Sequence, residues 1–374
     1  PKILNMNKAQ KQLNDMKNNS GTSDTVVKLG TELFKILAKH PAIKYDVLPL
    51  LDPDRQHEEP IYLFMKNWDP DLNQFPWEAL YVPGVGFLSA NKLFPIARAQ
   101  KVAYEKSEWT FKPPLKMMAI LGAGGDDLLT RVSAEKEWES LYNALRCSRL
   151  KIELQVLLCE EELKAKIDAQ RPAWITTGLL HDRDQLFSDI RNFAPHILHF
   201  FCHGASNPLP RLDVSNLRNW VLGRQGGIQI EGSQLKQRAD PYGNIWLVTL
   251  NCCESAQNSN GSGFLSMPMA CSLVSSGFPV VVGMREQIAE SFAHDFCRLF
   301  YEALLDDFGD RLDNAKKEKG VTEVHWACAL FAARQKICEM IDSEKGISEV
   351  AASAKEWTIT VIHTRLETFH LRMS

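Results

Sequence analysis

The sequence lacks the cysteine pattern of a secreted, disulfide-bonded domain. It holds nine cysteines among 374 residues, an odd number without even spacing, and several stand inside apolar runs. A C-x-x-C pair, the usual half of a zinc site, is also missing. We therefore expect a reducing, cytoplasmic setting, and we predict neither a metal nor any other cofactor.

The chain also has no large excess of positive or negative charge and no long apolar stretch. The formal net charge is only -3 at pH 7, which argues against a nucleic-acid-binding surface spread over the molecule. No segment has the length of a membrane span or the pattern of a signal peptide. With 45% hydrophobic and 24% charged residues, the composition is that of a soluble globular protein. The first residue, Pro1, is not methionine, which suggests a fragment or a processed piece.

A phosphate-binding loop is present only in part. The segment Gly122-Ala123-Gly124-Gly125 follows an apolar run and precedes a helical pattern. It lacks the full G-x-G-x-x-G pattern, and there is no P-loop Lys-Ser/Thr pair. A turn at the edge of a sheet is the preferred interpretation, and a nucleotide-binding enzyme stays an alternative.

The patterns that are present divide the chain into three parts. Residues 1–25 are polar and predict a short exposed helix and a linker, as at the tail of an upstream domain. Residues 26–114 predict a helix, a short strand and a hairpin, which would form an amino-terminal supporting part. Residues 115–374 alternate strands with helices of ten or more residues and predict the main domain.

This alternation predicts an α/β sandwich with a mainly parallel central sheet that is covered by helices on both faces. Residues 357–362 predict a late strand, which we place at an edge. Residues 207–237 are rich in Pro and Gly and predict an irregular, mobile flap. The strands that we expect at the centre of the sheet comprise residues 117–121, 196–201, 245–250 and 278–283.

Two residues of catalytic type follow apolar, strand-like runs. His203 follows the run 199–202, and Cys253 comes shortly after the run 247–250. Because neighbouring parallel strands end at one shared edge, a base and a thiol there would form a nucleophilic dyad. Their separation of 50 residues is close to the offset typical of caspases. Cys252 is a competitor, since adjacent strand residues face opposite sides and the alternation does not say which faces the core.

With these residues in view, the chain resembles the CHAT family of caspase-like peptidases, within the caspase–separase superfamily. The resemblance implies a caspase-like α/β/α sandwich with an amino-terminal extension, and it favours Cys253 over Cys252 as the nucleophile. The segments that carry it are 199–204 and 250–255, which match the family's apolar-His-Gly and Leu-x-x-Cys-Glu-Ser/Thr motifs, with support from 75–80, 277–285 and 296–304.

The resemblance implies a cysteine endopeptidase. Cys253 would attack a peptide carbonyl as the thiolate, and His203 would act as general acid and base. The backbone N–H groups of Gly204 and Cys253 would hold the oxyanion.

Three charged residues are candidates for the substrate pocket. In caspase-like folds, the loop that contains Arg285 and Glu286 lines the pocket for the residue before the cleaved bond. Arg285 would select an acidic side chain and Glu286 a basic one, while a salt bridge between surface groups is at least as good an interpretation. Glu254 fits the start of a helix better than a substrate contact.

The remaining histidines predict no metal site. His294 and Asp295 fit the solvated face of a helix. His199 stands inside a central strand and predicts a hydrogen-bonded core histidine. His196, His199 and His203 lack the accompanying cysteine or carboxylate spacing of a zinc site.

The biological setting follows from the resemblance alone. It implies a prokaryotic, regulated protease of antiviral defence or programmed cell death, with a protein substrate such as a gasdermin-like pore protein. An upstream helical-repeat sensor or an RNA-guided CRISPR effector would be the activating partner. The alternative is a caspase-like scaffold with an unused dyad, against which the presence of both catalytic residues argues.

Overall fold

The computed structural model describes most of the chain, and all that follows refers to this part. The described residues are 6–18, 25–51, 60–66, 70–91, 94–100, 108–123, 133–205, 210–224, 226–252, 268–286, 289–318, 320–344, 346–365 and 369–373. Two of the predicted site residues, Cys253 and Glu254, lie outside these ranges.

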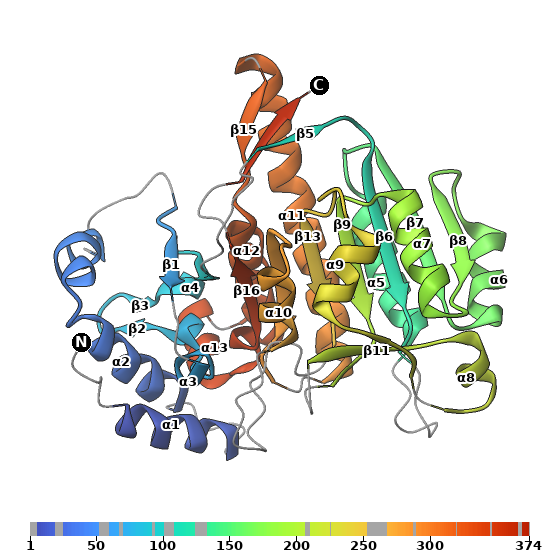
Figure 1. The fold of residues 1–374 in the computed structure, drawn as a ribbon. Coiled ribbons are helices and arrows are strands. Elements are labelled where there is room, and N and C mark those ends of the chain that lie inside the picture. Colours follow the sequence, from blue (N-terminus) through green and yellow to red (C-terminus); the bar gives the residue numbers. More distant parts are fainter. Residues whose placement is uncertain are drawn as a thin grey trace.

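A nine-stranded sheet runs through the molecule (Figure 1). In their spatial order, its strands are β1 (Leu63–Lys66), β4 (Ile96–Ala99), β16 (Thr360–Thr364), β14 (Val280–Met284), β13 (Leu247–Leu250), β9 (Ile197–Phe201), β6 (Leu115–Leu121), β7 (Ile152–Leu158) and β8 (Ile175–Leu179). Within this sheet only the pair β14–β16 is antiparallel. The predicted mainly parallel sheet is therefore confirmed, and the four strands expected at its centre lie there.

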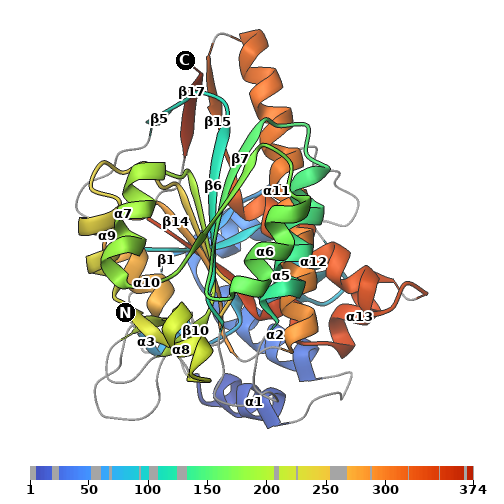
Figure 2. The ribbon, with the colours of Figure 1, turned by 90° about the vertical axis from the view of Figure 1, so that its right-hand side faces the viewer.

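Helices cover both faces of the sheet, as the alternation of elements predicts (Figure 2). Each layer packs on its own hydrophobic cluster. The layer on one face consists of α5 (Ala134–Arg146), α6 (Glu161–Gln170), α11 (Glu290–Glu318) and α12 (Trp326–Ile341), and the layer on the other consists of α7 (Arg183–Phe193), α9 (Gly232–Ala239) and α10 (Met269–Ser275). The fold is thus an α/β/α sandwich.

The central strand β9 shows why these segments are largely apolar. Ile197 and Phe201 belong to the cluster beneath α5 and α11. Leu198, Phe200 and the following Cys202 belong to the cluster on the opposite face. Because successive side chains alternate between two buried faces, apolar residues are needed on both, and the polar exception, His199, is buried.

The amino-terminal helix is not the exposed helix that its polar composition predicts. In α1 (Asn7–Asn18), the side chains of Ala9, Leu13 and Met16 are fully buried, and the helix packs on α2 (Thr25–Leu37). The three apolar residues are spaced at one helical turn and share a face. A narrow stripe of this kind is easily hidden by the lysines and asparagines around it.

The part up to residue 114 contributes directly to the central sheet, because β1 and β4 extend it beyond β16. The predicted hairpin is confirmed as β2 (Tyr81–Val82) and β3 (Gly86–Phe87). Gly84 in its turn has a φ of 83°, a conformation that favours glycine. The division of the chain at residues 25 and 114 stays a prediction.

The structure differs from the sequence predictions in three places. The late strand β16 lies inside the sheet rather than at its edge, since β4 and β1 are added outside it. Strand β8 has no counterpart in the predictions, because Thr176, Thr177 and Gly178 break its apolar pattern. The segment 207–237 is mostly regular, since its described residues form two strands and two helices. These are β11 (Arg211–Ser215), α8 (Leu217–Val221), β12 (Gly227–Ile230) and α9.

The remaining elements are short. A second three-stranded sheet, β15 (Val321–Glu323), β17 (His370–Met373) and β5 (Glu108–Phe111), stands at the upper end of the molecule in Figure 1. The other elements are α3 (Pro70–Asn73), α4 (Leu88–Asn91), α13 (Ile347–Ser353), a π turn at Ile43–Val47 and 3-10 turns at Leu48–Leu51, Trp77–Ala79 and Glu356–Thr358. Within the described ranges, no helix is long and apolar enough to span a bilayer.

A buried ion pair ties the segment 75–80 to the sheet. The guanidinium of Arg98 in β4 donates to both carboxylate oxygens of Glu78, at 3.2 and 2.8 Å, and also to the carbonyl of Phe75 at 3.0 Å. Both charged side chains are almost fully buried. The glutamate of the Pro-Trp-Glu segment therefore holds the amino-terminal part against the sheet.

Replacing Arg98 with methionine should destabilise the protein by about 3–5 kcal/mol, because it removes the cation that donates to the buried carboxylate of Glu78. Urea denaturation measures this loss. Arg238→Ala, which breaks a pair with Asp184 on the surface, is the control and should leave the midpoint unchanged within error. An equally small effect of Arg98→Met would contradict a structural role for the pair.

Candidate active site

The carboxyl ends of the central strands meet at the lower edge of the sheet in Figure 1, where β11 crosses them. There β11 pairs with β10 (His203–Ala205) and with β12 in a small antiparallel sheet. Gly122 marks the crossing, because the amide of Ser215 donates to its carbonyl at 2.7 Å. A Cβ on Gly122 would lie only 2.4 Å from the Val214 side chain. Close packing accounts for the glycine at this position; Gly124 and Gly125 lie outside the described residues.

His203 is the first residue of β10 and lies two positions beyond the end of β9. Its side chain is partly buried. The register of β10 and β11 sets Asp213 directly opposite it. One carboxylate oxygen of Asp213, Oδ1, is buried without a hydrogen-bond partner in the described part of the chain. Gly204, the predicted oxyanion residue, follows His203 in β10.

The register of β9 and β13 brings the two predicted catalytic segments together. Leu247 pairs with Ile197 and Leu250 with Phe200, an offset of fifty residues. The amide of Asn251 continues the ladder by donating to the carbonyl of Phe200 at 2.8 Å. The segments that contain residues 203 and 253 therefore leave neighbouring strands at the same edge.

Cys252 is a core residue. It is 3% exposed and belongs to the cluster under α7, α9 and α10. Its thiol contacts that of Cys202, and this contact, together with burial, raises the pKa of Cys202 well above its usual value. Cys252 therefore faces the interior.

A buried polar network lies beneath this edge, between the sheet and the helices α5 and α11. Its centre is Glu137, which is fully buried in the first turn of α5. His199 Nε2 and Asn251 Nδ2 lie 3.0 and 2.7 Å from Glu137 Oε1, and His294 Nδ1 lies 2.5 Å from Oε2. Burial opposes the charge of this carboxylate, but the two histidines lower the pKa of Glu137 to about 2.

The prediction that His199 is a hydrogen-bonded core histidine is confirmed, since its other ring nitrogen lies 3.2 Å from the hydroxyl of Tyr301. The prediction for His294 is wrong: the side chain is buried against Glu137. Its neighbour Asp295 is 40% exposed, as expected of a solvated face. Helical alternation alone could not reveal that His294 meets a buried carboxylate from a different helix.

Three residues of the network have the composition of a metal site. Ligand atoms of Glu137, His199 and Cys297 all lie within 4.8 Å of one another, and all three side chains are buried. Sequence spacing could not indicate this group, because its members come from α5, β9 and α11. Burial and the nearby Glu137 raise the pKa of the Cys297 thiol well above its usual value, so the sulfur is a neutral thiol in this arrangement.

The candidate pocket residues Arg285 and Glu286 follow β14 and contact each other. Arg285 is 3% exposed, and its Nη2 lies 2.6 Å from Glu286 Oε1. The second oxygen of Glu286 lies 3.2 Å from the ammonium of Lys355. Each charge thus already has a partner within the chain.

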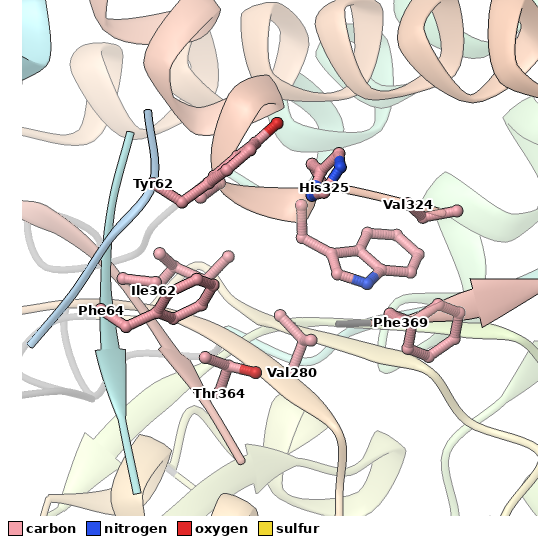
Figure 3. Close-up of a pocket in the computed structure, with 11 residues that line it drawn as sticks. Tyr62, Phe64, Val280, Val324, His325, Ile362, Thr364 and Phe369 are labelled. Atoms are coloured by element: carbon pink, nitrogen blue, oxygen red, sulfur yellow. The ribbon is translucent and has the colours of Figure 1, made fainter. Parts of the chain in front are cut away.

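An apolar hollow at the opposite edge of the sheet is distant from this site in the topology (Figure 3). It lies beside Val280, the first residue of β14, whereas the candidate site lies beyond the last residues of the central strands. The ring of Tyr62 stacks on that of His325, with centroids 4.3 Å apart, and its hydroxyl lies 3.0 Å from Cys328 Sγ. His203 is not among the described residues that line the hollow.

Comparison with protein families matches residues 27–325 to the model described as CHAT domain. No curated protein matches the chain. Among solved structures, the chain is similar to a chain of the separase–securin complex from Saccharomyces cerevisiae, with 12% identity over 84% of this chain and a TM-score of 0.41. It spans 16% of that chain.

Two further solved structures are also similar to this chain. Caspase-1 from Spodoptera frugiperda shows 12% identity over 74% of this chain and 95% of its own, with a TM-score of 0.31. The Arg-specific cysteine proteinase gingipain R shows 10% identity over 73% of this chain and 54% of its own, with a TM-score of 0.34.

The polar network makes a prediction about pH. Burial works against the charge of His294, but Glu137 and Glu290 outweigh it and raise its pKa above the ordinary 6.5. Protonated His294 therefore contributes stability that is fully present below pH 6.5 and is lost as the pH rises through the higher folded-state pKa. His294→Asn keeps a donor at the Nδ1 position but cannot bind the proton. The difference in unfolding free energy between wild type and variant should shrink from about pH 6 towards about pH 9, since the usual pKa of histidine lies near the lower end of this range. A constant difference in urea titrations across this range would contradict the assignment.

Proposed function

The chain belongs to the CHAT family, and we propose that it is a cysteine endopeptidase that cleaves a protein substrate through Cys253 and His203. Membership of this family of caspase-like peptidases supports the reaction type. The observation that carries the residue assignment is the fifty-residue register between β9 and β13. If the register continues past Asn251, residues 203 and 253 leave the sheet about one strand spacing apart, roughly 4.8 Å.

The choice of Cys253 over Cys252 is supported by the place of Cys252 in the core. A buried thiol that packs against Cys202 is out of reach of a peptide. Because neighbouring residues of an extended chain face opposite sides, the next residue is the better candidate for the open side.

The proposed reaction has two steps. Sγ of Cys253 bonds to the peptide carbonyl carbon as thiolate, the C–N bond breaks, and His203 gives a proton to the leaving amine. Water then attacks the thioester while His203 takes a proton from it, the C–S bond breaks, and the acid leaves with the thiolate and the imidazolium restored. The backbone N–H groups of Gly204 and Cys253 would stabilise the oxyanion in both steps.

The imidazole needs a partner that keeps it oriented. Asp213 faces His203 across the β10–β11 pair, and its Oδ1 is buried without a partner in the described residues. We assign Asp213 this orienting role. Such a carboxylate fixes the tautomer of the base and stabilises the imidazolium that forms during the reaction.

The alternative function is a caspase-like scaffold with an unused dyad. On the resemblance alone, we further propose a regulated role in prokaryotic antiviral defence or programmed cell death, with a gasdermin-like substrate and a sensor domain or an RNA-guided effector as activator. Regulation fails as an explanation if the isolated chain cleaves unrelated proteins without any partner.

Cys253→Ala should abolish both turnover and labelling by a thiol-reactive peptide probe. His203→Ala should lower kcat by about 10²–10⁴-fold, the usual contribution of an acid–base group. Cys252→Ala is the matched control and should keep labelling and turnover. Labelling that survives Cys253→Ala but not Cys252→Ala would sink the assignment, and a wild-type chain that shows neither labelling nor turnover would favour the scaffold.

The substrate pocket is proposed to include Arg285 and Glu286, with Glu254 as a minor candidate. Since Arg285 and Glu286 neutralise each other, substrate must displace one of them to bind the other. Cleavage of a peptide library by Arg285→Gln and Glu286→Gln tests this. A preference for an acidic residue that is lost only in Arg285→Gln assigns the pocket to the arginine, and a basic preference lost only in Glu286→Gln assigns it to the glutamate. Unchanged profiles in both variants would leave the pair a purely structural contact.

A further inference from the structure

Asn251 is the last described residue but one before the segment of Cys253, and it is held from three sides. It is 3% exposed and directly follows β13. Its amide N–H donates to the carbonyl of Phe200 in β9 at 2.8 Å. Its side-chain Nδ2 donates to Glu137 Oε1 at 2.7 Å and to the carbonyl of Ala293 at 3.1 Å. The strand end is thus fixed to β9, α5 and α11 at once.

The carboxylate of Glu137 has little freedom to move. Besides Asn251, it contacts His199 in β9 and His294 in α11. His294 in turn contacts Glu290 at 3.3 Å, and Glu290 accepts the backbone N–H of Ser133 at 2.6 Å. Ser133 caps α5. These contacts link the starts of α5 and α11 to each other and, through His199 and Asn251, to the sheet. A shift of Glu137 would therefore disturb several elements together.

The side chain of Asn251 is oriented at a cost. The amide group faces two acceptors, Glu137 Oε1 and the carbonyl oxygen of Ala293. The nitrogen, which is the donor, must therefore point towards them. The remaining oxygen, Oδ1, is buried and has no hydrogen-bond partner in the described residues. Buried polar atoms are nearly always paired, and an exception in a native structure calls for an explanation. Here the explanation is that Glu137 dictates the orientation of this residue.

We propose that Glu137 and Asn251 are positioning residues of the peptidase, which hold the end of β13 so that the next residues present the nucleophile. The proposal rests on the proposed function, because it takes Cys253 as the nucleophile. Neither residue touches substrate. The hydrogen bond between them anchors the end of β13 to a buried carboxylate, and this fixes where the segment after Cys252 begins.

The same residues could be suspected of holding a metal, since Glu137, His199 and Cys297 lie close together. The contacts favour the hydrogen-bonded arrangement. Oε1 of Glu137 is already shared by His199 and Asn251, and Oε2 faces His294. A cation on Oε1 would have to displace Asn251 Nδ2, which donates to this oxygen.

The test uses the whole chain with Glu137→Gln, Asn251→Ala and the double variant. The first readout is the rate at which iodoacetamide alkylates Cys253, followed by mass spectrometry, with the exposed Cys147 as internal reference. The second is kcat and KM on a peptide selected from the library. Asn251→Ala removes only a small side chain and serves if Glu137→Gln does not fold.

Asp240→Asn is the matched control. Asp240 is a buried carboxylate at the end of α9, before β13 begins. It accepts the amide N–H of Asn244 at 2.7 Å and contacts Lys236 at 2.6 Å. This variant should lose stability without changing the alkylation of Cys253 relative to Cys147.

For each positioning variant we expect kcat to fall by about 10- to 100-fold with KM nearly unchanged, since a shift of about 1 Å can cost that much. The alkylation of Cys253 should slow while that of Cys147 does not. Because both residues act through one contact, the double variant should be no slower than the worse single variant. Folded variants with wild-type kinetics and Cys253 reactivity would overturn the proposal, while the loss of turnover in Cys253→Ala would leave the proposed function intact. Stoichiometric zinc in the wild type that is lost in Glu137→Gln would replace the positioning role with a metal site.

Discussion

Hydrogen bonding between β9 and β13 fixes a register in which each residue stands beside the residue fifty positions later. The candidate site depends on this pairing. Two segments that are distant in the sequence leave the sheet at one edge because their strands are parallel neighbours in the same phase. The pairing itself depends on burial, since both strands are covered on two faces and a slip by one residue would turn every apolar side chain to the wrong cluster.

The layer beneath the edge of the sheet is polar, and this is where the fold departs from a simple apolar sandwich. Glu137 brings a negative charge into the cluster between the sheet and α11, and it is stabilised there by His199 and His294. An ion pair of this kind costs desolvation that good geometry must offset. Its location directly under Asn251 fits the positioning role that we propose, because the network restrains the strand end that precedes the segment of the proposed nucleophile.

Much of the fold could be predicted from the sequence, and the failures have physical causes. Apolar runs of five or six residues identified the central strands, since only strands buried on both faces carry such runs. Strand β8 escaped prediction because Thr176 and Thr177 face a less buried edge, and β16 was misplaced because its pairing with β4 is a long-range contact. The segment 207–237 was misjudged from its glycines: Gly223 and Gly226 have positive φ angles between α8 and β12, and Gly227 is the first residue of β12.

The site was predictable to a smaller extent. Motif and spacing made His203 and Cys253 candidates, with Cys252 as a competitor. The network around Glu137 has no pattern in the sequence, because its members come from α5, β9 and α11 and from Asn251 after β13. The most direct test of the account is a crystal structure of the chain after reaction with a peptide-based thiol-reactive inhibitor. The account predicts a thioether on Cys253, with the imidazole of His203 in the same cleft. A thioether on another cysteine, or an imidazole on the far face of the domain, would contradict it.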